Sequence, residues 1–170
     1  MPVPVLTGPR LILRAPGPQD REATVDAVGD YDVSRWLAVV PHPYTLDDAD
    51  DFLALCARGE LNAWAITLAG RMIGAIGLDS GFGYWLARPH WGQGFATEAG
   101  RLVLGHHFDQ PVSGEIFANY FVGNEGSRRV LEKLGFRDIG ASRTHSAAQG
   151  REVEARRMRL TRADWAASQA

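Results

Sequence analysis

Three short apolar runs in the middle of the chain restrict its fold more than any other feature. AWAITL (63–68) and MIGAIGL (72–78) are separated by a short glycine-containing turn (69–71), and FGYWLA (82–87) follows a second turn (79–81). Apolar runs of this length joined by such turns are typical of antiparallel β-strands. The sequence therefore predicts a three-stranded meander at the centre of the fold.

The segments on either side of the meander alternate between helical and extended patterns. Before it, the sequence predicts a strand (10–15), a helix (19–28), a short helix within 31–40 and a helix from Thr45 to Gly59. After it come a helix that begins at Gly94, a strand (114–121), a helix (125–135), a hairpin (136–146 and 151–160) and a last helical turn (161–168). This order predicts an α+β fold with a mixed, mostly antiparallel sheet of about seven strands and helices packed over it.

Length and charge exclude several classes of protein. With 170 residues, 45% apolar and 22% charged, residues 1–170 are expected to form one globular domain. The net charge of −2 gives no bias toward nucleic acid or acidic membranes, so neither is an expected partner. Cys56 is the only cysteine, which fits a reducing compartment, and no apolar run is long enough for a signal peptide or a membrane span. We therefore expect a soluble, cytoplasmic protein.

The stretch WGQGFATEAGRLVLGHH (Trp91 to His107) places two glycines directly before a helical pattern. It is not a Rossmann fingerprint, because Thr97 stands where the third glycine is needed, and it is not a P-loop, because it has no lysine. Successive backbone N–H groups from Gly92 to Thr97 could form a nest for a pyrophosphate, supported by the helix dipole. A plain turn, in which glycine only supplies a positive φ, explains the same residues.

The chain resembles the GNAT superfamily of N-acetyltransferases, and in particular the branch of RimJ- and RimL-like N-terminal acetyltransferases. The residues that carry the resemblance are GYWLARPHWGQGFATEA (83–99) and NEGSRRVLEKLGF (124–136), in the same order as in the family. The opening LTGPRLILRAP and the run IGAIGL also look like that branch. The resemblance implies a GNAT-like sheet whose middle strands splay apart and helices on both of its faces.

The resemblance further implies acetyl-CoA as the donor, used as a co-substrate, and no metal. The family's phosphate motif maps onto Trp91, Gly92, Gln93, Gly94, Phe95 and Ala96, with Thr97 next in the nest. Trp91 departs from the Gln or Arg that is usual at the first position. Since main-chain N–H groups hold most of the pyrophosphate, this departure costs little. The pantetheine is expected along GYWLA, with backbone groups of Leu86 and Ala87 pairing with its amides and the Leu86 N–H polarising the thioester carbonyl.

Two residues of the second motif are candidates for contacts at the thioester. From the residues alone, Asn124 is an N-cap and Ser127 an ordinary residue of the first helical turn. The resemblance implies that Asn124 contacts pantetheine and that the Ser127 hydroxyl lies near the sulfur, where it could protonate the departing thiolate. A thiolate with a pKa of about 8.5 is already a fair leaving group, so this step needs little help.

The general base is harder to identify. Many relatives carry an acid two residues before their GYWL, where this chain has Gly81. Asp79 lies two residues further back, on the same face of a regular strand, but a turn role in DSGFG explains it better. Tyr84 is an alternative base or a packing residue, and His90 a weaker candidate. A covalent route through Cys56 is disfavoured, because a cysteine on an apolar helix face is usually inert.

The acceptor is expected to be a primary amine that attacks the thioester directly in a ternary complex. Protein N-termini, free amino acids, polyamines and aminoglycosides all fit the sequence. The segment before the meander covers the acceptor site in the resembling family, so Trp36, His42 and Tyr44 are candidates for its lining. The resemblance also allows a homodimer, since homodimers are common in that branch. The rival hypothesis is a CoA-binding sensor or interaction module with weak or no turnover, and Gly81 in place of an acid is its best support.

Overall fold

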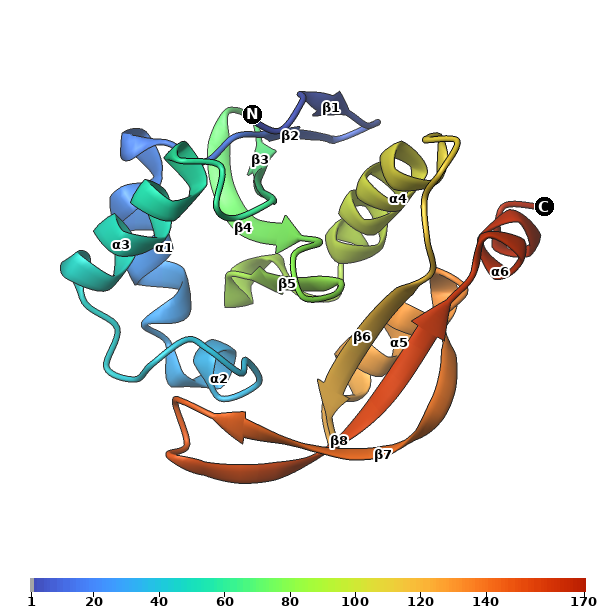
Figure 1. Ribbon diagram of the computed structural model, residues 1–170. Helices are drawn as coiled ribbons and strands as arrows, with labels where there is room; N and C mark the ends of the chain where they lie inside the picture. Colours follow the sequence, from blue (N-terminus) through green and yellow to red (C-terminus); the bar gives the residue numbers. More distant parts are fainter. Residues whose placement is uncertain (1) are drawn as a thin grey trace.

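The computed structural model describes residues 2–170 and contains two β-sheets with helices packed around them (Figure 1). The first sheet has five strands in the order β1 (Leu6–Thr7), β2 (Leu11–Arg14), β3 (Ala63–Leu68), β4 (Arg71–Gly77) and β5 (Gly83–Leu86). The second has three, in the order β6 (Ile116–Phe121), β8 (Arg151–Leu160) and β7 (Arg137–Ser146). All neighbouring strands within each sheet are antiparallel. The α+β class predicted from the sequence is confirmed.

The helices begin and end close to their predicted signals. They are the 3-10 turn η1 (Pro18–Asp20), α1 (Arg21–Val28), α2 (Tyr31–Ser34), α3 (Leu46–Ala57), the 3-10 turn η2 (Arg88–His90), α4 (Phe95–Phe108), α5 (Glu125–Lys133) and α6 (Arg162–Ser168). Thr45 caps α3 through a hydrogen bond from the Asp48 N–H, and Gly135 follows α5 with a φ of 97°. Within residues 2–170, no helix is both long and apolar enough to cross a bilayer.

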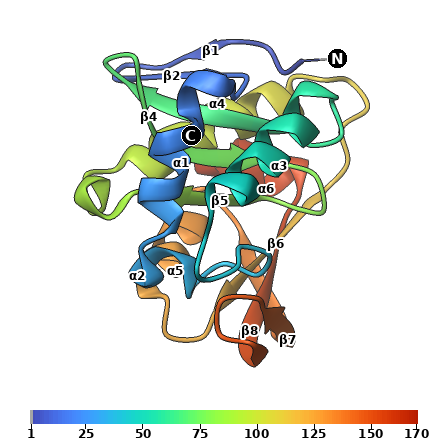
Figure 2. The same cartoon turned by 90° about the vertical axis from the view of Figure 1, so that its left-hand side faces the viewer.

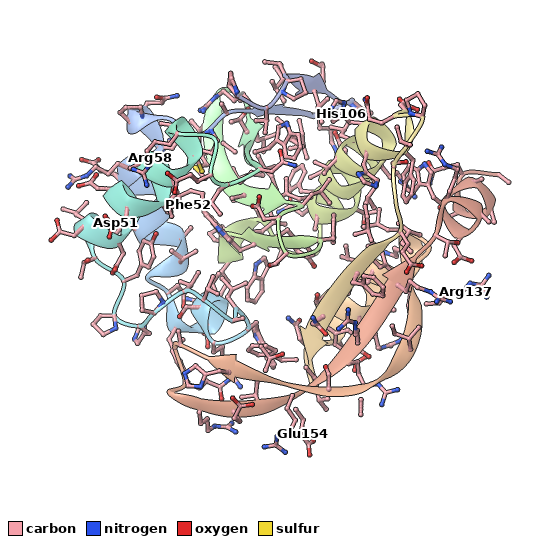
Figure 3. All side chains as sticks on the ribbon, viewed as in Figure 1. Asp51, Phe52, Arg58, His106, Arg137 and Glu154 are labelled. Atoms are coloured by element: carbon pink, nitrogen blue, oxygen red, sulfur yellow. The ribbon has the colours of Figure 1, made fainter. Side chains whose placement is uncertain are left out.

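The predicted meander is β3, β4 and β5. Its first turn uses Ala69 and Gly70, both at positive φ, which is the conformation that a tight hairpin requires. The sheet is covered on both faces (Figure 2). On one face, Phe82 and Leu86 belong to the same core cluster as Ala99 of α4. On the other face, Trp85 and Phe52 of α3 pack against one small cluster of buried residues (Ala65, Met72 and Ala75). Figure 3 shows Phe52 on the inner side of α3, whereas the neighbouring Asp51 points outward.

The two sheets separate between β5 and β6, which start side by side and diverge (Figure 1). A parallel bridge joins Phe82 to Ala118, and the Phe82 N–H donates to the Phe117 carbonyl over 2.8 Å. Gly81 makes this approach possible: its φ is 140°, and a Cβ there would lie 2.7 Å from the Phe117 oxygen. The splayed middle strands implied by the resemblance are therefore present, with a closed end at Phe82 and an open end beyond Leu86.

The structure differs from the sequence prediction in two details. The strand count is eight rather than about seven, because the two-residue β1 is too short to show an alternating pattern. The helix predicted over 19–28 begins as the 3-10 turn η1, because the Asp20 carboxylate accepts the Gly17 N–H and tightens the first turn.

Candidate active site

The loop between η2 and α4 carries a row of backbone N–H groups without acceptors. Gly92 and Gly94 have φ values of 73° and 80°, and within residues 2–170 the N–H groups of residues 92–97 have no hydrogen-bond partner. The first helical bond of α4 runs from the Glu98 N–H to the Gly94 carbonyl, over 3.0 Å. A row of free N–H groups at a helix N-terminus, with the positive end of the helix dipole behind it, offers hydrogen-bond donors to an anion. We call residues 92–97 the phosphate cradle.

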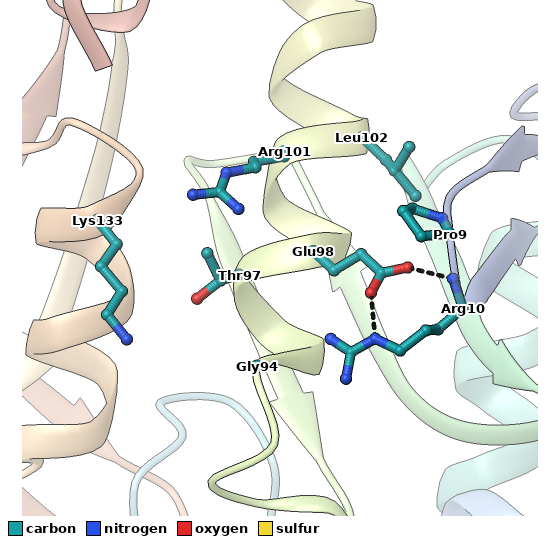
Figure 4. Close-up of a pocket in the computed structure, with 8 residues that line it drawn as sticks. All are labelled: Pro9, Arg10, Gly94, Thr97, Glu98, Arg101, Leu102 and Lys133. Atoms are coloured by element: carbon teal, nitrogen blue, oxygen red, sulfur yellow. Dashed lines mark hydrogen bonds and ion pairs between the residues drawn. The ribbon is translucent and has the colours of Figure 1, made fainter. Parts of the chain in front are cut away.

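A hollow beside the cradle is rimmed by cationic side chains (Figure 4). Arg101 and Lys133 reach into it from α4 and α5, on the side of α4 where Thr97 also lies. Arg10 reaches it from the opposite side, just before β2. The hollow is lined by Pro9, Arg10, Gly94, Thr97, Glu98, Arg101, Leu102 and Lys133. The cradle therefore lies in a positively charged setting, although the whole chain is slightly acidic.

The register of β4 and β5 decides which backbone groups face the gap between the sheets. The Ala87 N–H donates to the Ile73 carbonyl over 2.8 Å, and positions along an antiparallel strand alternate between inward and outward groups. The Leu86 N–H therefore points away from β4, toward the gap. The Leu86 carbonyl accepts from the Trp91 indole over 2.8 Å.

The predicted role of Ala87 is corrected by the same register. Its N–H is used by Ile73, and its carbonyl accepts the His90 N–H over 2.9 Å, so both of its backbone groups already have partners inside the protein. Of the two predicted residues, Leu86 keeps a free N–H on the gap side. The sequence alone could not separate them, because the pairing with β4 decides which residues of β5 direct their N–H groups toward β4 and which toward the gap.

Tyr84 and Ser127 meet across the gap, although they are 43 positions apart in the sequence. Burial raises the pKa of Tyr84 to about 12, and a hydrogen bond with the Ser127 side chain offsets part of that rise. The phenol is therefore neutral near pH 7, a state that disfavours the general-base alternative for Tyr84. Asn124 supports the arrangement as the N-cap of α5, since its Oδ1 accepts the Ser127 N–H over 3.2 Å.

Asp79 lies in the turn between β4 and β5. Its carboxylate is exposed and accepts the Asn62 N–H over 2.6 Å, just before β3 begins. It also precedes Gly81 and Phe82, at the closed end of the gap. The contact with Asn62 favours the turn role of Asp79 over the general-base role, which stays a prediction. His90 ends η2, where its ring packs against Phe95 with 6.2 Å between centroids.

We expect Asp79→Asn to keep the activity and the pH profile of the wild type, because the amide oxygen can still accept the Asn62 N–H. Asp79→Ala removes that acceptor and should lower the free energy of unfolding by about 1 kcal/mol, again without changing the pH profile. Rate–pH profiles and chemical denaturation of both variants test this. A rate of Asp79→Asn that is low at neutral pH and recovers in alkali would restore Asp79 as the base.

The three residues predicted to line the acceptor site lie in different surroundings. Trp36 packs on Phe121 of β6, and its ring lies 3.6 Å from where a Cβ on Gly123 would be, beside the start of α5. His42 packs against Tyr31 with ring centroids 5.0 Å apart. Tyr44 lies near the acidic residues of α3, and burial, followed by the nearby charge of Asp48, raises its pKa to about 12. Trp36 also lines a hollow.

That hollow contains residues that the sequence did not single out. It is lined by Arg35, Trp36, Phe121, Val122, Arg143, Gln149, Arg151, Glu152, Val153 and Glu154. Gln149, at the tip of the β7–β8 hairpin, donates to the Arg35 carbonyl over 2.9 Å and so ties the hairpin to the segment after α2. No local sequence signal could have found this contact, because its partners are 114 residues apart.

Cys56 is an inert thiol in this structure. It is partly buried on α3, and burial, followed by the negative charge of Asp79, raises its pKa to about 11. A thiol in this state is neutral at physiological pH. These surroundings agree with the prediction that a covalent route through Cys56 is disfavoured.

The domain thus has two sheets that splay apart beside a row of free backbone N–H groups at the start of α4. The Acetyltransferase (GNAT) domain family matches residues 10–137, and the chain belongs to this family of acetyltransferases. Its relatives include YoaA of Bacillus subtilis and p20 of Bacillus licheniformis, both described as uncharacterized N-acetyltransferases. YoaA is 29% identical to this chain, and the alignment covers 86% of this chain and 90% of YoaA. The p20 protein is 26% identical, and the alignment covers 92% of this chain and 96% of p20.

Solved structures show the same fold. Mycobacterium smegmatis RimJ, in complex with CoA-disulfide, aligns with a TM-score of 0.74 and 22% identity, covering 98% of this chain and 94% of that one. The resemblance to the GNAT superfamily and to its RimJ-like members is thereby confirmed.

Proposed function

We propose that this protein transfers an acetyl group from acetyl-CoA to a primary amine, by direct attack within a ternary complex. The observation that carries the proposal is the row of free N–H groups at residues 92–97, which opens next to the gap where the Leu86 N–H is also free. The RimJ structure, described as a complex with CoA-disulfide, supports the choice of CoA as the phosphate-bearing ligand.

In this proposal the cradle binds the diphosphate of CoA through its N–H groups and the dipole of α4. Arg101 and Lys133 add positive charge from the two helices that face the same hollow. The pantetheine then follows β5 into the gap, where the Leu86 N–H donates to the thioester carbonyl. This donor stabilises the oxyanion that develops when the amine attacks.

Ser127 is the proposed proton donor to the departing CoA thiolate. Asn124 fixes its backbone, and the neutral phenol of Tyr84 hydrogen-bonds to its side chain. The phenol can then pass its proton to the serine oxygen, and the phenolate so formed regains a proton from water, which also carries the proton that the attacking amine releases. Tyr84 and Ser127 thus act as one donor unit.

The carboxylate of Asp79, the acidic candidate from the sequence, is hydrogen-bonded to the Asn62 N–H, so we assign deprotonation of the acceptor to water. An alkylammonium must lose its proton before it attacks. The rate should then rise with pH until the pKa of the acceptor amine is passed.

The acceptor class remains a set of amines: protein N-termini, free amino acids, polyamines or aminoglycosides. The rival proposal, a CoA-binding module without turnover, rested on Gly81 in place of an acid. The structure supplies another reason for that glycine, namely the close approach to the Phe117 carbonyl at the bridge between the sheets. Gly81 therefore does not by itself favour the rival.

We expect acetyl-CoA to protect the fold. At about 100 times its dissociation constant, a ligand that binds only the native state adds about 2.7 kcal/mol to the free energy of unfolding. Thermal unfolding with acetyl-CoA, ATP and NAD measures this, and ATP and NAD are the controls. If millimolar acetyl-CoA gives no shift, the cradle does not bind CoA. Thiol release against a panel of amines then separates an enzyme from a binding module.

A further inference from the structure

We infer that Arg10 and Glu98 are a positioning pair for the phosphate cradle: Arg10 aims the Gly94 N–H at the ligand and neutralises the carboxylate beside it. The inference rests on the proposed binding of CoA and assigns a role to two residues outside the cradle itself. The supporting observations are their hydrogen bonds, the geometry of one peptide group and the local charge (Figure 4).

Glu98 joins the start of β2 to the first turns of α4. Its Oε1 accepts the backbone N–H groups of Arg10 over 2.8 Å and of Leu11 over 3.0 Å. Its Oε2 accepts Nε of Arg10 over 2.7 Å, and the Glu98 side chain is only 11% exposed. A carboxylate held by three donors from one neighbouring segment has little freedom, and it fixes the guanidinium in turn.

The fixed guanidinium holds one peptide group of the cradle. Arg10 Nη1 donates to the Gln93 carbonyl over 2.8 Å, and the guanidinium carbon lies 4.5 Å from the centre of the Phe95 ring. A trans peptide is planar, so its carbonyl and the next N–H point in opposite directions. Holding the Gln93 carbonyl toward Arg10 therefore turns the Gly94 N–H away from Arg10, into the cradle.

The positive charge of Arg10 also compensates the negative charge of Glu98 beside the cradle. Burial alone would raise the pKa of Glu98, but hydrogen bonds from the Arg10 backbone and side chain and from the Leu11 N–H outweigh it and hold that pKa below its usual value. Glu98 is therefore ionised, and without Arg10 its charge would repel a diphosphate. Arg10 Nη2 has no acceptor within residues 2–170 and lies 3.4 Å from where a Cβ on Gly94 would be. It can donate to the anion.

The same strand offers a matched control. Arg14, at the other end of β2, pairs with Asp20 through two hydrogen bonds of 2.7 and 2.8 Å, and the Asp20 side chain is 3% exposed. In both pairs an arginine at one end of β2 contacts a carboxylate: Arg10 contacts Glu98 of α4, and Arg14 contacts Asp20 of η1. Only the Arg10 pair touches the cradle.

The experiment measures CoA affinity by calorimetry and steady-state rates for the wild type, Arg10→Met and Arg14→Met. We expect Arg10→Met to weaken CoA binding by at least about tenfold, since a hydrogen bond to a charged group typically contributes that much. It should raise the KM for acetyl-CoA and leave kcat nearly unchanged. Arg14→Met should lose stability and keep the wild-type CoA affinity. Glu98→Gln added to Arg10→Met should recover part of the lost affinity, because it removes the unpaired carboxylate.

The outcomes separate this inference from the proposed function. If the wild type does not bind CoA, the proposed function fails. If the wild type binds CoA and Arg10→Met binds it equally well, or the double variant recovers nothing, the positioning role is wrong and the proposed function stands. Should Arg10→Met not fold, Arg10→Lys replaces it: lysine keeps the charge but cannot hold Glu98 and the Gln93 carbonyl together. Wild-type affinity in Arg10→Lys overturns the inference.

Discussion

Gly94→Val is expected to abolish measurable CoA binding while the protein remains folded. Gly94 is the N-cap of α4 with a φ of 80°, and its N–H is one of the six in the cradle. A branched side chain there crowds Arg10, whose Nη2 lies 3.4 Å from the Cβ position, and it pushes the backbone away from the left-handed conformation that directs the N–H groups. Calorimetric titration with CoA, together with circular dichroism of the apo variant, measures the effect.

Gly70→Val is the matched control for this substitution. Gly70 has a φ of 81°, so valine meets the same backbone strain, but it lies in the β3–β4 hairpin with no atom within 4 Å of its Cβ position. We expect both variants to lose a similar amount of stability, about 1 to 3 kcal/mol, and only Gly94→Val to lose CoA binding. Equal CoA affinity in the two variants would mean that residues 92–97 form a plain turn.

Ser127→Ala is expected to lower kcat about 100-fold and to leave the affinity for acetyl-CoA nearly unchanged. A positioned proton donor typically contributes about 10²- to 10⁴-fold, and the low end applies because a thiolate leaves readily and water can substitute. Alanine keeps the backbone N–H that Asn124 caps, so the start of α5 should survive. Stopped-flow or steady-state thiol release with saturating acetyl-CoA measures the change.

Tyr84→Phe is the companion variant, because it removes the hydroxyl that hydrogen-bonds to Ser127 and keeps the ring. With a pKa of about 12, Tyr84 is protonated throughout the neutral and mildly alkaline range, so its removal should lower kcat without shifting either limb of the pH profile below about pH 10. The proton-donor role would have to be withdrawn if Ser127→Ala and Tyr84→Phe both turned over at the wild-type rate.

Features determined by neighbouring residues were predictable from the sequence. The meander follows from three apolar runs and their turns, the start of α3 from Thr45 and Asp48, and the end of α5 from Gly135. In each case the residues that decide the conformation lie within a few positions of one another. The cradle belongs to the same group, because its glycines and the helix they precede are contiguous.

Features determined by distant residues were not predictable. The closed end of the gap depends on Gly81 meeting the Phe117 carbonyl, and Ala87 loses its free N–H because of the register with Ile73. The Asp79 carboxylate accepts a hydrogen bond from the Asn62 N–H, and the spacing of the two residues along the chain does not predict this contact. Arg10 and Glu98 are 88 positions apart, and only the fold places them together.

A crystal structure with bound acetyl-CoA would show whether the cradle and the gap hold this ligand. We expect the diphosphate within hydrogen-bonding distance of the N–H groups of residues 92–97, and the thioester carbonyl facing the Leu86 N–H in the gap between β5 and β6. The sulfur should lie beside the Ser127 hydroxyl. A diphosphate bound elsewhere, or a thioester outside the gap, would mean that the cradle and the Leu86 N–H do not have the proposed roles.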